Sequence, residues 1–389
     1  MTVPSSSSST SHVKHYKPYF TPLEVERLSA KQRGKLSVSR EERLRQQACG
    51  FIDAVGVRCG FPRRTIATAQ TLYMRFHLFF PYKDFNYVEV SLSTLYVSSK
   101  LHDTIKKPRD IILASFPIRY PNLVRKGAID PATAEAHGLE HERKGVLNCE
   151  RLVLETMGFK FGVEVGLSGV IKIGKRLGLD KSLCQSAWQV AIDCHRTQAA
   201  LSYPPHIIAL GSIYTSTLLL RETTDPLEAH ERSSMNASSI SAAQVVRLLG
   251  NTGSWETEYS ATAGDIDDIA HALIDLYTTI LSLLPDLQAN IHTPSPVSPI
   301  EPGTTSSQST ITSTPSPTAF PLPIYWTTQT LTELKIKLRE RRPGGPPATT
   351  GWSSTPVEGA QDEEGDEAVE GMGRNDGTVR FLWDEGTVL

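Results

Sequence analysis

The chain has 389 residues, which is enough for two or three domains and at least one sizeable hydrophobic core. It contains no run of about 18 apolar residues, and its serine-rich start lacks the charged and apolar regions of a secretory signal, so we expect an intracellular protein without a membrane span. The 40 Lys and Arg against 42 Asp and Glu give a net charge of −2, which argues against a chain-wide basic surface for nucleic acid.

Changes in composition divide the chain into four segments. Residues 1–35 begin with a serine run and predict a flexible arm. Residues 36–161 carry apolar side chains at helical spacing, and residues 162–284 do so again around a polar insert at 221–254. Residues 285–389 are rich in Ser, Thr, Pro and Gly and end in an acidic stretch. Such a composition has too little apolar surface to offset chain entropy, so we expect a disordered tail.

Five helices are predicted in the second segment, because apolar residues recur there at steps of three and four. These helices cover residues 41–59, 64–79, 87–101, 108–116 and 141–159. The third is apolar around most of its circumference and is therefore expected to be central and buried. Five helices around a buried third one form a compact all-α domain.

Four more helices are predicted in the third segment, with a Pro-Pro step placed where proline is tolerated at a helix start. They cover residues 166–177, 183–197, 205–220 and 266–284. The periodicity thus predicts an all-α fold with two tandem helical units of similar size.

Several short motifs occur in an order that resembles two consecutive cyclin boxes. In the first unit they are Ala48–Asp53, Arg64–Gln70, Leu95–Leu101, Lys107–Ile112 and Val146–Phe159, and in the second unit they are Trp188–Asp193 and Tyr203–Leu210. The second set is similar to the second box of the K, T and L cyclins. The resemblance covers about residues 40–284 and is strongest over the first box.

The chain therefore resembles the transcriptional cyclins, and among them the fungal subunits that partner a kinase of the RNA polymerase II C-terminal domain. The resemblance implies two tandem five-helix cyclin boxes. It also implies a nuclear regulatory subunit, without catalytic activity of its own, that binds and activates a cyclin-dependent kinase and promotes transcription elongation. The polymerase domain would be the substrate of the complex, and a third kinase subunit is a further possible partner.

The resemblance also implies roles for individual residues. Lys100 and Glu150 match the lysine and glutamate with which cyclins hydrogen-bond the regulatory helix of the kinase, and charge-assisted contacts of this kind fix orientation. The alternative is an intramolecular ion pair or two solvated surface charges. The large apolar side chains nearby could form the hydrophobic part of the interface, with core packing as the alternative for each. They are Phe116, Leu147, Leu154 and Met157.

No pattern of an enzyme or of a metal site is present in the sequence. The histidines are widely spaced without an H-E-x-x-H arrangement, and the chain has no P-loop, no G-x-G-x-x-G and no G-x-S-x-G. Its five cysteines are scattered without a C-x-x-C pair, which predicts reduced thiols packed in helices. We therefore expect no cofactor, no metal and no catalytic residue.

Six Ser-Pro or Thr-Pro steps lie in the tail, at Thr293, Ser295, Ser298, Thr314, Ser316 and Thr355. A proline-directed kinase held by the boxes would meet them at high effective concentration, so we consider them candidate phosphorylation sites. The alternative is that a segment of this composition contains such steps by chance.

Two other functions remain as alternatives. The chain could be another transcriptional cyclin of the K, T, L or C type with a different kinase. A transcription-factor-IIB-like adaptor also uses tandem cyclin folds, but it would need a zinc ribbon before the first repeat and a basic face on the second, and neither is found. We therefore expect no membrane contact and no direct binding of nucleic acid.

Overall fold

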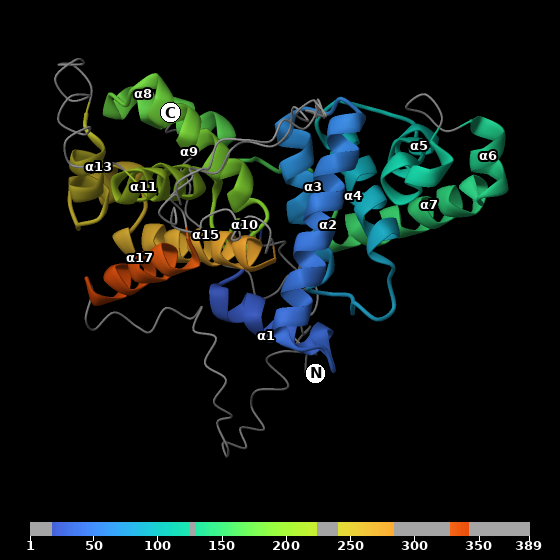
Figure 1. Ribbon diagram of the computed structural model, residues 1–389, viewed down its shortest axis with the longest axis horizontal. Coiled ribbons are helices and arrows are strands. Elements are labelled where there is room, and N and C mark those ends of the chain that lie inside the picture. The colour runs from blue at the N-terminus through green and yellow to red at the C-terminus, as the bar shows by residue number, and fades with distance from the viewer. Residues whose placement is uncertain (1–17, 125–129, 224–239, 284–326, 342–389) are drawn as a thin grey trace, which may run out of the picture.

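The computed structural model describes residues 18–124, 130–223, 240–283 and 327–341. Within these ranges all regular secondary structure is helical, which confirms the predicted all-α class. The helices form two groups that lie side by side, and each group surrounds its own apolar core (Figure 1). No helix among the described residues combines the length and the apolar character needed to cross a membrane.

The first group contains the five helices that the periodicity predicts, here called the first box. They are α2 (Val38–Arg58), α3 (Arg63–Phe76), α4 (Tyr87–Leu101), α5 (Pro108–Arg119) and α7 (Leu139–Thr156), with the short η1 (Pro121–Leu123) and α6 (Pro131–Ala136) between the last two. Helix α4 is central and packs against all four of the others. Its middle residues are buried, as expected for a helix that is apolar on most sides.

The second group, the second box, repeats this arrangement around a central α11. Its helices are α8 (Leu167–Leu177), α9 (Lys181–Cys194), α11 (Pro205–Thr223), α13 (Ala242–Leu249) and α15 (Ala263–Leu283), with the short α10 (Ala199–Ser202) and α14 (Ser254–Tyr259). Helix α13 corrects the prediction of a polar insert at 221–254. Ser241 caps it, and Val245, Val246 and Leu249 are buried. Residues 224–239 of that insert lie outside the described residues.

Part of the predicted flexible arm is also helical. Helix α1 (Pro22–Arg33) begins with a capping box, in which the Thr21 hydroxyl accepts from the Glu24 amide and the Glu24 carboxylate accepts from the Thr21 amide. Just before it, Phe20 is buried in the core of the second box, and its amide donates to the Leu201 carbonyl at 3.0 Å. The arm is therefore fixed by a tertiary contact that local composition does not reveal, while residues 1–17 lie outside the description.

The predicted disordered tail likewise contains a helix, α17 (Thr328–Glu340). It packs along α15, and Leu331, Leu334 and Leu338 are buried in the core of the second box. Figure 1 shows α17 beside α15 at the edge of this box. The chain that follows also contacts the box, because the Arg341 guanidinium donates to the Tyr214 hydroxyl at 2.7 Å. Residues 284–326 and 342–389 of the tail are not described.

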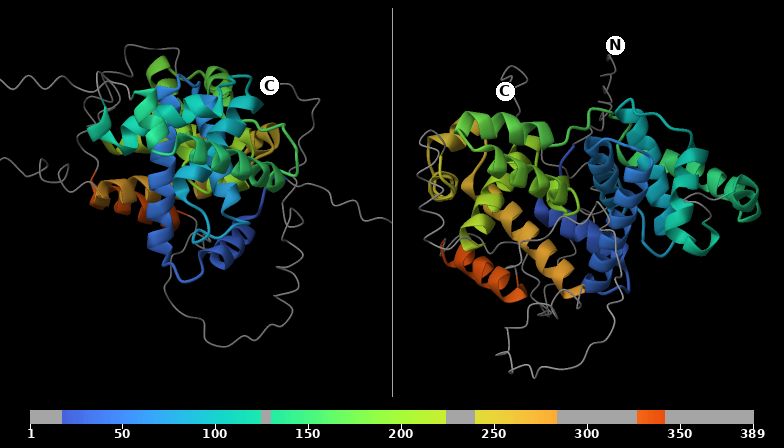
Figure 2. Two further views of the ribbon diagram at one scale, coloured as in Figure 1. Left: turned by 90° about the vertical axis from the view of Figure 1, so that its right-hand side faces the viewer. Right: turned by 45° about the horizontal axis from the view of Figure 1, so that its top comes forward.

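The two boxes and the N-terminal segment meet around α1, which lies at their junction in the views of Figures 1 and 2. Buried Arg75 of α3 donates to the Thr156 carbonyl at 2.8 Å and to the Pro18 carbonyl at 3.1 Å. Gln46 of α2 donates to the Arg196 carbonyl of the second box at 3.0 Å. The Gln46 contact thus joins the two boxes directly, and Arg75 joins the N-terminal segment to the first box.

All five cysteines are free thiols. Four are buried, and burial raises the pKa of Cys49 and Cys59 to about 11 and that of Cys149 and Cys194 to about 12. Only Cys184 on α9 is partly exposed.

Candidate functional site

Lys100 and Glu150 meet on the surface of the first box. Lys100 lies in the last turn of α4 and Glu150 in the second half of α7, and their side chains are joined by an ion pair of 2.6 Å between Nζ and Oε1. The Lys100 side chain is 42% exposed and that of Glu150 is 15% exposed. The two residues that the resemblance singles out are thus adjacent. In the free chain they form an intramolecular ion pair, which is one of the two alternatives given above.

Close packing of α4 against α7 sets this geometry. The Ser93 hydroxyl on α4 donates to the Val146 carbonyl on α7 at 3.0 Å. Gly145 lies beside Glu89, so close that a Cβ on the glycine would come within 2.8 Å of a carboxylate oxygen. A side chain at Gly145 would therefore displace the carboxylate end of Glu89.

The electrostatics hold Lys100 in its charged form. Burial acts to lower its pKa, but the hydrogen bond and the charge of Glu150 outweigh it, so that the pKa of Lys100 lies above its ordinary value. The ammonium also lies 4.0 Å from the centre of the Tyr96 ring. A lysine has three donors, so donors beyond the one given to Glu150 remain for a partner at this exposed position.

An apolar stripe runs along the same face of α7. Leu147 and Leu154 are both partly buried and flank Glu150 at steps of three and four, which places all three on one side of the helix. Leu154 also packs against the first core, whereas Leu147 does not. The stripe can therefore supply hydrophobic contacts beside the charged pair.

Two of the apolar candidates are core residues. Phe116 is only 1% exposed and Met157 is fully buried, and both belong to the core of the first box. The expectation that Phe116 offers its ring to a partner is therefore corrected. The residue faces inward from α5 because it follows the buried Ile112 by four positions and therefore lies on the same side of that helix.

Sequence reasoning missed two aromatic side chains at the end of α7. Phe159 and Phe161 are 56% and 55% exposed in the segment that leaves the helix. Phe159 has a φ of +57°, an unusual conformation for a residue with a side chain, and its amide donates to the Leu154 carbonyl at 3.1 Å. The signal was present in the printed sequence, since the F-K-F triplet comes directly after a helix end.

The remaining candidates lie elsewhere. Thr293, Ser295, Ser298, Thr314, Ser316 and Thr355 fall outside the described residues. Within the described ranges no group of three His, Cys, Asp or Glu side chains is arranged to hold a metal ion.

Comparison with known proteins finds relatives of similar sequence. No protein-family model matches the chain. Over 197 residues, 50% of this chain, it is 34% identical to CTD kinase subunit beta of Schizosaccharomyces pombe, of which the match covers 56%. Over 283 residues, 72% of this chain, it is 26% identical to cyclin pch1 of the same yeast, of which the match covers 75%. The chain thus spans little more than half the length of the first of these relatives.

A solved structure has the same fold. A chain of the yeast RNA Pol II CTD kinase CTDK-1 complex aligns with a TM-score of 0.58 at 20% identity, and the alignment covers 95% of this chain and 96% of the other. The tandem helical boxes agree with the order of the motifs in the sequence. In sequence the chain is thus similar to CTD kinase subunit beta and to cyclin pch1, and in fold it is similar to a chain of the CTDK-1 complex.

Proposed function

We propose that the protein is the regulatory subunit of a cyclin-dependent kinase that phosphorylates the C-terminal domain of RNA polymerase II. The observation that carries the proposal is the Lys100–Glu150 pair, which bridges α4 and α7 at the surface. Its two residues match the lysine and glutamate that the resemblance assigns to the kinase contact. The partly buried Leu147 and Leu154 and the exposed Phe159 extend this surface along α7. The kinase-binding surface is defined here by these five residues. The similarity to a protein named CTD kinase subunit beta supports a kinase that acts on the C-terminal domain of the polymerase.

The mechanism is allosteric positioning. Phosphoryl transfer by a protein kinase requires that a lysine which orients the ATP phosphates pairs with a glutamate on the regulatory helix of the kinase. A partner that docks against this helix holds the glutamate in place and shifts the kinase to its active arrangement. In this proposal α4 and α7 form the docking surface, and the cyclin contributes no atom to the transfer itself.

The ion pair within the free chain prepares the surface for docking. It holds two long side chains in one arrangement, so less rotamer freedom is lost when a partner binds. The remaining donors of Lys100 and the second oxygen of Glu150 can then serve backbone groups at the end of a partner helix, where such groups lack partners. An intramolecular pair and a kinase contact are therefore two uses of one structure.

A charge swap separates these two uses. Lys100→Glu/Glu150→Lys keeps an ion pair between α4 and α7 but reverses the charges that face the kinase. We expect this variant to keep the melting profile of the wild type and to lose kinase activation by on the order of 100-fold, because two oriented charged contacts become repulsive. The measurement is phosphorylation of a heptad-repeat peptide by the co-purified kinase.

The matched control is another exposed ion pair of the first box, Arg109–Glu135, whose side-chain atoms are 3.0 Å apart. Arg109→Glu/Glu135→Arg should leave activation unchanged. If the Lys100–Glu150 swap restored full activation after a damaging single substitution, the pair would be a structural contact only and the proposal would fail.

The finer parts of the function rest on the same proposal. The protein would act in the nucleus, without catalytic activity of its own, and with a third subunit in the kinase complex. The six Ser-Pro and Thr-Pro steps of the tail would be phosphorylated by the bound kinase. Mass spectrometry of complexes with active and inactive kinase tests the last point, and identical phosphate maps would contradict it.

A further inference from the structure

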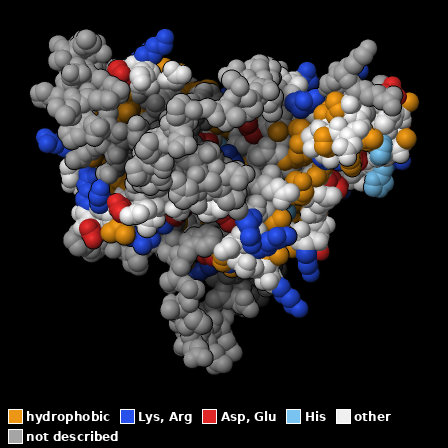
Figure 3. Space-filling model, in the orientation of Figure 1, with side chains coloured by type: hydrophobic (Ala, Val, Ile, Leu, Met, Phe, Trp, Pro, Cys, Tyr) orange, Lys and Arg blue, Asp and Glu red, His pale blue; other side chains and the backbone are white. Residues whose placement is uncertain are grey.

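Five exposed cations surround the turn between α1 and α2. Arg27 and Lys31 lie one helical turn apart on α1, Lys35 lies in the connecting loop, and Arg40 and Arg43 share a face of α2. None of them forms an ion pair with another described residue. We call these five residues the cationic elbow. Figure 3 shows Lys and Arg side chains gathered at the lower centre of the molecule, where α1 and α2 meet.

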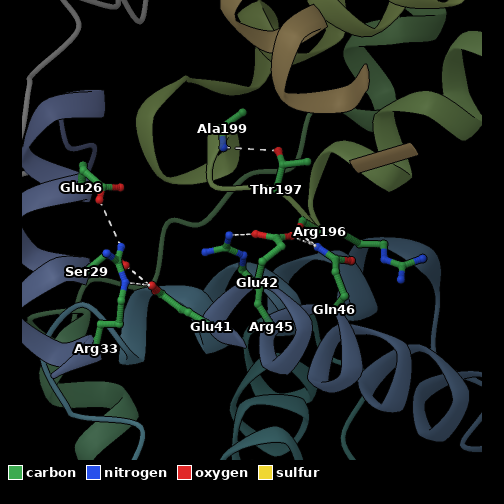
Figure 4. A network of polar contacts seen from close by, with 10 residues as sticks. All are labelled: Glu26, Ser29, Arg33, Glu41, Glu42, Arg45, Gln46, Arg196, Thr197 and Ala199. Atoms are coloured by element: carbon green, nitrogen blue, oxygen red, sulfur yellow. Dashed lines mark hydrogen bonds and ion pairs between the residues drawn. The ribbon is translucent and has the colours of Figure 1, made fainter. Parts of the chain in front are cut away.

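The acidic side chains of the same segment are already used internally. Glu41 accepts from Ser29 and Arg33, and the same arginine also pairs with Glu26 at 3.1 Å. Glu42 pairs with Arg45 and accepts from Gln46 at 2.9 Å. Figure 4 shows these contacts on the inner side of the two helices, toward the junction of the boxes.

The fourth acid, Glu24, is held in the capping box of α1. Residues 22–46 contain seven Lys or Arg and four Glu, so every acid has a local partner while five cations have none. The elbow is therefore a concentrated positive surface on a chain whose overall charge is −2, and it selects for an anionic partner.

We propose that the acidic segment from Glu358 to Glu370 of this chain docks on the cationic elbow. The segment holds seven Asp or Glu, and no Lys or Arg occurs between Pro343 and Gly373. It is the most acidic part of the chain. The elbow offers a positive surface of complementary charge within the same chain. The pairing joins the most acidic segment of the chain to five cations that have no acidic partner among the described residues.

The length of the chain permits this contact. Glu358 follows Arg341, the last described residue, by 17 positions, which span up to roughly 56 Å when extended. A folded unit of about 260 residues has a radius of gyration of about 18 Å, so the extended linker is about three times as long as this radius and permits a contact away from α17. A tethered ligand at this distance has an effective concentration in the millimolar range, which compensates for the weakness of exposed ion pairs.

Docking of this kind has two consequences. The tail shields the elbow from other polyanions, so the elbow becomes available only when the tail is displaced. The contact also weakens with salt, because screening at about 1 M ionic strength shortens the reach of exposed charges to about 3 Å. Phosphorylation of Thr355, three residues before Glu358, would add negative charge and strengthen the contact.

Zero-length carbodiimide cross-linking of the full chain tests the proposal, since it joins carboxylates only to amines that touch them. At low salt we expect cross-links from the tryptic peptide that contains Glu358 to Glu370 to Lys31 and Lys35, and we expect their loss at about 1 M salt. Arg40→Glu/Arg43→Glu, which keeps both reporter lysines, should lower the yield at least fivefold. The matched control Lys106→Glu/Lys107→Glu changes two exposed cations near Cys59, at the opposite end of α2, and should leave the yield unchanged.

The other outcomes decide against the proposal. Absence of these cross-links at low salt, or an equal loss in both variants, overturns it. Cross-links between labelled and unlabelled copies in an isotope mixture mean that a second copy supplies the acidic segment. Should the α2 variant fold poorly, a tail variant that replaces Glu363, Glu364 and Glu367 by Gln leaves both boxes untouched. It should speed the acetylation of Lys31 and Lys35 relative to Lys106, and an unchanged ratio would overturn the proposal.

Discussion

The two boxes share one helix arrangement but treat the outer face of their fifth helix differently. In the second box, α17 covers α15, and three leucines are buried between them. Lys335 of α17 also pairs with Asp275 of α15. In the first box, the corresponding helix α7 keeps Leu147, Glu150 and Leu154 along a face that no described helix covers.

This difference separates stability from recognition. A helix that is covered by the same chain contributes its apolar face to folding, because burial of that face removes it from water. A helix that keeps apolar residues and an ordered ion pair at the surface has a face still available for a partner. The comparison therefore assigns the second box the task of anchoring the chain ends and the first box the task of docking.

The largest effect is expected from a charge introduced between α17 and α15. Leu334→Asp should lower the free energy of unfolding of the second box by about 4 kcal/mol, because it removes a buried side chain and buries a carboxylate instead. Hydrogen exchange should accelerate in α11 and α15 but not in α4. The control Ile336→Asp changes an exposed position of the same helix and should cost less than about 0.5 kcal/mol. Equal effects of the two substitutions would mean that α17 is not part of the core.

Acid should weaken the second box more than the first. Burial lowers the pKa of His195, His206 and His271 to about 4, and for His271 two cations of α17 act in the same direction. The first box holds one such residue, His77, whose pKa burial also lowers to about 4. Because the unfolded histidine has a pKa near about 6.5, the unfolded chain binds more protons as the pH falls from there toward 4. The stability that the neutral histidines contribute is therefore complete above about pH 6.5 and is lost as the pH falls toward about 4.

At about pH 5 each of these histidines should cost about 2 kcal/mol, so the second box should lose about three times as much as the first. Urea unfolding at about pH 7 and about pH 5 measures the loss. His271→Phe should flatten the pH dependence. If the free energy of unfolding depended on pH in this variant as it does in the wild type, groups other than His271 would cause the loss.

An intermediate effect is expected at Leu147. Leu147→Asp should weaken kinase binding by about tenfold, because it removes an apolar contact from the centre of the docking face. The free energy of unfolding should change by less than about 0.5 kcal/mol, since this side chain does not pack against the first core. Asn148→Asp adds the same charge at the neighbouring exposed position and serves as the control. Affinity that drops equally in both variants would point to net charge and not to the stripe.

The smallest effect is expected for the stability of the free chain. A double-mutant cycle on Lys100 and Glu150 should give a coupling energy of about 0.2–1 kcal/mol, as is usual for exposed ion pairs, and less at high salt. Since the pKa of Lys100 is raised, this contribution is present at neutral pH and is lost only as the pH rises through the titration of the lysine. A coupling of several kcal/mol would indicate a structural pair and would weaken the contrast between the boxes.

Much of the helical core could be predicted from periodicity, and the failures have physical reasons. Helices α2 to α5 and α7 were found because long amphipathic patterns are a strong signal. Helix α13 was missed because eight residues give little periodicity within a polar segment. Helix α1 depends on the tertiary anchor of Phe20, which has no local signature. Helix α17 was readable, since Leu331, Leu334 and Leu338 follow a helical step after the capping Thr327, but the composition of its neighbours hid it.

The site was predictable only in part. The juxtaposition of Lys100 and Glu150 came from family resemblance, because residues 50 positions apart show no local relation. Whether Phe116 or Leu147 faces outward depends on how each helix is rotated against the core. For a helix with apolar residues on more than one side, spacing alone does not tell which side is buried. The structure resolves this choice by burying Phe116 and leaving Leu147 partly exposed.

The burial of four of the five cysteines has a consequence for chemical labelling. Only the thiolate reacts with alkylating reagents, and the pKa values of about 11 to 12 keep the four buried thiols protonated at neutral pH as well as inaccessible. Cys184 is the partly exposed one, although burial raises the pKa of its thiol as well. The natural sequence thus provides one preferred attachment point on α9, from which a fluorophore can report on the position of the tail without any engineered cysteine in the boxes.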